Sequence, residues 1–136
     1  QDPGRLPVIK GLEKRIRHVT NGARYSLKEL DSALRIISSV GNRSFRHYCL
    51  QSIDVSHPAS TVVVFVPCEL YGGKQYNVTS LEAAEVQVKI GQDDIEEKIG
   101  IVANLLEQAR TDNERIAYID VRFNEPVMKL RQPQKK

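Results

Sequence analysis

The sequence VQVKIG at residues 86–91 opens the last third of the chain and predicts a β-strand that ends at a glycine. An amphipathic helix is expected over residues 93–110, followed by a strand, RIAYIDVRF, at 115–123. After a tight turn, PVMKL at 126–130 predicts a final strand. This strand–helix–hairpin unit would end the fold on an exposed strand edge. Because an unpaired edge is a template for the backbone of another chain, the unit favours a binding module over an enzyme.

Size and composition indicate one globular domain. The chain has 136 residues, of which 40% are hydrophobic and 27% are charged. A chain of this length can bury a hydrophobic core that does not depend on disulfides or metal ions for its stability. Its formal charge of +3 is modest, and Lys and Arg are spread along the whole chain instead of being grouped in one stretch. Nucleic-acid-binding domains usually gather these residues on one face, so nucleic acid is not expected as a partner.

Two helices are predicted. Ser26 and Glu29 have the spacing of a capping box, and the helix that they begin should end at Gly41-Asn42. Its apolar residues recur at helical spacing: Leu27, Leu30, Leu34 and Ile37. The second helix, 93–110, has one apolar stripe formed by Ile95, Ile99, Val102, Leu106 and Ala109. Ile101 and Leu105 widen this stripe. Its first turn is acidic (Asp93, Asp94, Glu96 and Glu97), which the helix dipole explains better than a metal site does.

The next two segments are β. Residues 12–24 should form a short helix or an irregular connection, and residues 67–83 a longer loop with or without a short strand. Strands are expected at 47–55 and 60–67, the second so rich in β-branched residues that a central place in a sheet is indicated. In the strand at 115–123, Ile119, Val121 and Phe123 should point to one face, and Tyr118, Asp120 and Arg122 to the other. Helices followed by hairpins predict an α+β fold, with a mostly antiparallel sheet and two main helices packed on one of its faces.

Two cysteines, Cys49 and Cys68, lie on or just beyond adjacent predicted strands. Reflection through the turn near His57 places them roughly opposite each other, which would allow a cross-strand disulfide. The alternative is two buried thiols that act as small hydrophobic side chains.

The sequence has little that indicates chemistry. His47 and Cys49 could face one metal ion from a single strand, but no further ligands stand at suitable spacing. Gly72-Gly73-Lys74 lacks the spacing of a phosphate-binding loop. We therefore assign no catalytic, cofactor-binding or metal-binding residues and expect a protein that is not an enzyme.

Several motifs resemble those of the FtsQ/DivIB family of bacterial division proteins, in the β domain that follows the family's POTRA domain. One is Leu6-Pro7-Val8-Ile9-Lys10-Gly11 at the start of the chain. The others are the strand that ends in Ile90-Gly91 and the strand Tyr118-Ile119-Asp120-Val121-Arg122-Phe123. The layout matches over about residues 6–131, with the more specific part at 86–131.

The resemblance implies a non-enzymatic scaffold of the cell-division machinery. Such a domain is extracytoplasmic (periplasmic), is tethered by a membrane helix upstream and binds FtsB/DivIC-like and FtsL-like partners, one of which adds a β-strand to the last strand of the domain. Residues 1–5 would then be a linker or an expression scar, 6–131 the domain, and 132–136 a basic tail. The implied partner-binding residues are Arg122, Phe123, Asn124, Pro126, Val127, Met128, Lys129, Leu130 and Arg131.

Two alternative functions belong to other classes. One is a basic nucleic-acid-binding module, which a salt-sensitive shift of a labelled oligonucleotide would favour. The other is a periplasmic glycan-binding domain, which the absence of tryptophan disfavours.

Overall fold

The chain forms an α+β fold with one six-stranded sheet and two helices in the computed structural model. The structure describes residues 7–12, 28–42, 45, 47–57, 59–70, 84–112 and 114–131. In chain order its elements are β1 (Val8–Lys10), α1 (Lys28–Gly41), β2 (Tyr48–Asp54), β3 (Thr61–Pro67), β4 (Val86–Ile90), α3 (Ile95–Thr111), β5 (Ile116–Asp120) and β6 (Val127–Leu130).

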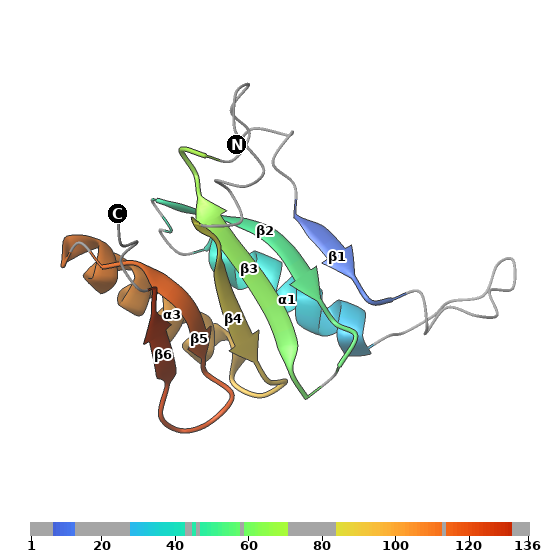
Figure 1. Cartoon of the computed structure of the whole chain (residues 1–136). Helices are drawn as coiled ribbons and strands as arrows, with labels where there is room; N and C mark the ends of the chain where they lie inside the picture. The colour runs from blue at the N-terminus through green and yellow to red at the C-terminus, as the bar shows by residue number, and fades with distance from the viewer. Residues whose placement is uncertain are drawn as a thin grey trace, which may run out of the picture.

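The strands follow one another across the sheet in chain order, from β1 at one edge to β6 at the other (Figure 1). Three neighbouring pairs are antiparallel, but β1 pairs with β2 and β4 pairs with β5 in parallel. The prediction of an α+β fold is confirmed. The prediction of a mostly antiparallel sheet holds only in part, because the sheet is mixed. Each parallel pair has a helix between its two strands, which returns the chain to the end where the first strand began.

Both helices lie on the same face of the sheet (Figure 1). Helix α3 buries the predicted stripe completely, since Ile95, Ile99, Val102, Leu106 and Ala109 are all buried in the core. These residues pack with inward-facing side chains of the four central strands, among them Phe65, which is fully buried in β3. The opposite side of the sheet, which neither helix covers, is called the open face below.

The apolar stripe predicted for α1 is partly wrong. Leu34 is 51% exposed, whereas Ala33 and Ile36 are fully buried. Leu30 and Ile37 are half-buried. The buried side of the helix is therefore rotated by about one residue from the Leu-rich stripe, because α1 packs against both α3 and the sheet and small residues such as Ala33 permit that close approach.

Strand β5 is also shorter than predicted. It ends at Asp120, so Arg122 and Phe123 belong to the turn that leads to β6. Ile119 and Val121 are buried as expected, but Phe123 is 61% exposed and the prediction that it shares their face is wrong. The side chain of Asp120 accepts a hydrogen bond from the backbone of Arg122, and this local bond turns the chain away from the ladder.

The backbone conformation and close packing at the end of β1 explain the glycine of the Leu-Pro-Val-Ile-Lys-Gly motif. Gly11 ends β1 with a φ of 94°, and a Cβ at this position would lie 2.5 Å from the backbone nitrogen of Ser56. The hydroxyl of Ser56 and that nitrogen both donate to the carboxylate of Asp54, and the two bonds hold the pKa of Asp54 below its usual range. Only glycine fits both the backbone angle and the close approach.

Some predictions fall outside the described residues. They concern the side chains of the capping box at Ser26 and Glu29, the connection over residues 12–24 beyond Leu12, and most of the loop at 67–83.

Candidate partner-binding edge

Strand β6 forms one edge of the sheet. Within the described part of the chain it pairs only with β5, so its other side has no neighbouring strand. Every residue of β6 has an exposed side chain, in contrast to the central strands. The predicted final strand is therefore present, at Val127–Leu130, and it lies at the edge.

Apolar side chains gather at this edge. The described residues include six large hydrophobic side chains that are exposed, and four of them lie between Phe123 and Leu130. Only Val8 in β1 and Leu34 in α1 lie elsewhere. Exposed apolar side chains are ordinary when scattered, but a cluster beside an unpaired strand is typical of an interaction site. The four are Phe123, Val127, Met128 and Leu130.

The direction of the β6 amides follows from one hydrogen bond. The amide of Arg131 donates to the carbonyl oxygen of Arg115, which precedes β5, at an N···O distance of 2.8 Å. Alternate residues of a strand direct both backbone groups to the same neighbour, so the amides of Lys129 and Val127 also face β5. Two N–H groups therefore point away from the sheet, those of Met128 and Leu130.

The side chains of β6 also alternate between two faces. Met128 pairs with the buried Ile119, so its side chain lies on the helix side of the sheet, and Leu130 does so opposite Ile116. Lys129 pairs with Tyr118 and Val127 with Asp120, which places both on the open face. The edge therefore presents Met128 and Leu130 on one face, and a cation with one valine on the other.

Several contacts hold the turn between β5 and β6 in place. The guanidinium of Arg122 donates two hydrogen bonds to the carboxylate of Asp120, at 2.9 and 2.6 Å. These bonds hold the pKa of the Asp120 carboxyl below its usual range. The same guanidinium lies 5.1 Å from the centroid of the Phe123 ring, within cation–π distance.

Helix α3 contributes a further contact that the sequence did not reveal. The ammonium group of Lys98 donates to the carbonyl oxygen of Phe123 at 2.8 Å. Lys98 lies 25 residues before that carbonyl and belongs to no recognisable motif. The contact appears only when α3 packs behind the hairpin, so no pattern in the sequence identifies it.

The nine predicted partner-binding residues divide into two groups. Seven are exposed: Phe123, Asn124, Pro126, Val127, Met128, Lys129 and Leu130. The other two, Arg122 and Arg131, are half-buried and use their guanidinium groups for bonds within the domain. The exposed edge is thus narrower than the set expected from the sequence.

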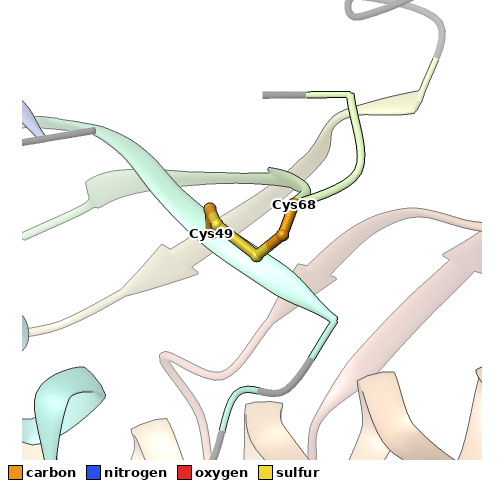
Figure 2. Close-up of a disulfide and its surroundings, with 2 residues drawn as sticks. All are labelled: Cys49 and Cys68. Atoms are coloured by element: carbon orange, nitrogen blue, oxygen red, sulfur yellow. A yellow bond between two sulfur atoms is a disulfide. The ribbon is translucent and has the colours of Figure 1, made fainter. Parts of the chain in front are cut away.

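Cys49 and Cys68 form a disulfide, with their Cα atoms 5.1 Å apart (Figure 2). Cys49 lies in β2 opposite Val66, and Cys68 follows β3, so the bond links the two strands diagonally. The amide of Cys68 donates to the carbonyl of His47 at 2.9 Å, which continues the ladder past the end of β3. Because Cys49 is in the disulfide, the pair His47 and Cys49 supplies no free thiolate for a metal ion or for catalysis.

Other kinds of site are not formed by the described residues. No group of three or more His, Cys, Asp or Glu side chains among them is arranged to hold a metal ion. None of their helices has the length and apolar character required to span a bilayer. A cavity between α1 and the start of α3 is lined by Arg35, Ser38, Ser39, Asn42 and Glu96, of which Arg35 and Glu96 form an ion pair.

No protein-family model matches the chain, and no curated protein matches it.

Proposed function

We propose that this chain is a non-enzymatic binding domain that accepts a β-strand from a partner protein at the outer edge of β6. The proposal is carried by one observation: no strand of the described residues pairs with the outer side of β6, where four apolar side chains between Phe123 and Leu130 are exposed. Strand addition uses both features, since main-chain hydrogen bonds provide affinity and alternate side chains provide specificity.

The edge is suited to this role because it is held in place before any partner arrives. The Asp120–Arg122 pair and the bond from Lys98 fix the turn that leads into β6. Pro126, directly before the strand, has no N–H, so the donors available to a partner begin at Met128. A strand that is ordered in the free domain lowers the entropy lost on binding.

The class of partner follows from the sequence resemblance. We propose an extracytoplasmic domain of an FtsQ/DivIB-like scaffold of bacterial cell division, whose added strand comes from an FtsB/DivIC-like protein, with an FtsL-like protein in the same assembly. The disulfide is consistent with this location, because disulfides persist in oxidising compartments such as the periplasm. A membrane tether upstream of the domain is part of the same proposal.

A proline substitution at Met128 tests strand addition. Met128→Pro removes an N–H that points away from the sheet and introduces a ring against an incoming strand. We expect at least a 10-fold loss of affinity for the extracytoplasmic segment of the cognate FtsB-like protein, measured by calorimetry, with little change in the thermal unfolding of the domain.

The matched control is Met128→Ala, which shortens the same side chain and keeps the N–H. Its loss of affinity should be clearly smaller than that of the proline variant. If a folded Met128→Pro domain binds as tightly as the unmodified domain, the partner does not add a strand to β6.

A further inference from the structure

We infer that Arg131 is a positioning residue that holds β6 in place across the sheet, and that it does not contact the partner. The inference rests on the proposed strand addition at β6, and it reassigns a residue that the sequence placed among the partner contacts. It follows from where the guanidinium of Arg131 lies and from how little else holds β6.

Arg131 connects β6 to a strand that is not its neighbour. It directly follows β6, and its Nη2 donates to the carbonyl oxygen of Glu85, at 2.7 Å. Glu85 directly precedes β4, and β5 separates β4 from β6 in the sheet. The side chain therefore reaches across the beginning of β5 and ties together three strands at one end of the sheet.

The position of the guanidinium also limits what else it can bind. The Nε of Arg131 is buried and has no hydrogen-bond partner among the described residues. A buried nitrogen is not presented to an approaching strand. By contrast, Lys129, on the same face of β6, is exposed and has a freely accessible charge.

Strand β6 depends on such hydrogen bonds because its side chains bury little apolar surface. All four are exposed, and a shift of register between Ile116 and Tyr118 interrupts the ladder that joins β6 to β5. At the turn, Lys98 and the Asp120–Arg122 pair hold one end of the hairpin. Arg131 holds the other end, through its backbone bond to Arg115 and its side-chain bond to Glu85.

Loss of the hydrogen bond from Arg131 to Glu85 should lower the fraction of molecules in which β6 is docked against β5. A partner that binds only the docked strand then has its apparent affinity reduced by that fraction, through slower association. Loss of a direct contact would instead speed dissociation, as most interface substitutions do. The two rates therefore distinguish a positioning role from a contact.

The test compares Arg131→Ala with Lys129→Ala, which removes the same charge two residues away without breaking a bond within the domain. In the free domain, amide hydrogen exchange at positions 127 and 129 should become at least 10-fold faster in Arg131→Ala and stay nearly unchanged in Lys129→Ala. With the extracytoplasmic segment of the FtsB-like protein, Arg131→Ala should bind about 10-fold more slowly and dissociate at the unmodified rate.

Unchanged exchange in Arg131→Ala, or a defect confined to faster dissociation, would overturn the positioning role. The exchange measurement needs no partner. If the unmodified domain fails to bind the FtsB-like segment, the proposed function fails, while the exchange result still decides whether Arg131 holds β6.

Discussion

Replacement of Leu106 by alanine is expected to lower the free energy of unfolding by about 2–5 kcal/mol. Leu106 is 2% exposed and lies in the middle of the buried stripe of α3, where it belongs to the core between the helices and the sheet. The substitution loses the transfer free energy of the side chain and leaves a cavity that close-packed neighbours fill only in part. Urea unfolding followed by circular dichroism measures the change.

Glu97→Ala is the matched control on the same helix. Glu97 is exposed in the first turn of α3, so its loss should cost well under about 1 kcal/mol, from a weaker interaction with the helix dipole. Equal losses for the two variants would show that the buried and exposed faces of α3 had been assigned wrongly.

Removal of the Cys49–Cys68 disulfide is expected to have the second-largest effect on stability. The two residues are separated by 19 positions, and closure of a loop of that size restricts the unfolded chain by roughly 3 kcal/mol in the chain-entropy model. A Cys49→Ser, Cys68→Ser double variant should unfold at correspondingly lower urea concentration than the oxidised domain.

The reductant provides the internal control. Dithiothreitol should destabilise the unmodified domain and leave the double serine variant unaffected. Two free thiols, counted in unreduced and denatured protein, would contradict the disulfide directly, because the chain has only two cysteines.

Local patterns predicted the helices and strands well wherever burial repeats with a regular period. The stripe of α3 could be predicted because all five of its residues are buried in the core. The stripe of α1 was predicted only in part, because its buried side is centred on Ala33 and Ile36 and leaves Leu34 exposed. Periodicity identifies an apolar side of a helix, but the neighbouring elements decide how the helix is rotated.

The pairing of strands was harder to predict than the strands themselves. The parallel pairing of β4 with β5 depends on how α3 returns the chain, which the composition of the strands does not specify. The early end of β5 depends on the side chain of Asp120, which bonds to its own backbone two residues later. Such local competition between a side chain and the ladder is invisible to a pattern of alternating residues.

The edge strand was correctly placed from sequence, but its internal contacts were not. Pro126 and the position of the hairpin at the end of the fold indicated an edge. The roles of Lys98 and Arg131 depend on contacts 25 and 46 residues distant in the chain. Contacts at that separation appear only once the sheet is assembled, so the sequence could not reveal the bond from Arg131 to Glu85.

Amide hydrogen exchange of the domain, free and bound to the extracytoplasmic segment of the FtsB-like protein, is the most direct test of strand addition at β6. The amides of Met128 and Leu130 should exchange rapidly in the free domain, where they bond to water, and at least 10-fold more slowly in the complex, where carbonyl groups of the added strand would accept their hydrogen bonds. The amides of Val127 and Lys129, which face β5, should already be protected and change little. A complex in which Met128 and Leu130 still exchange rapidly, while protection develops on another surface, would show that the partner binds elsewhere.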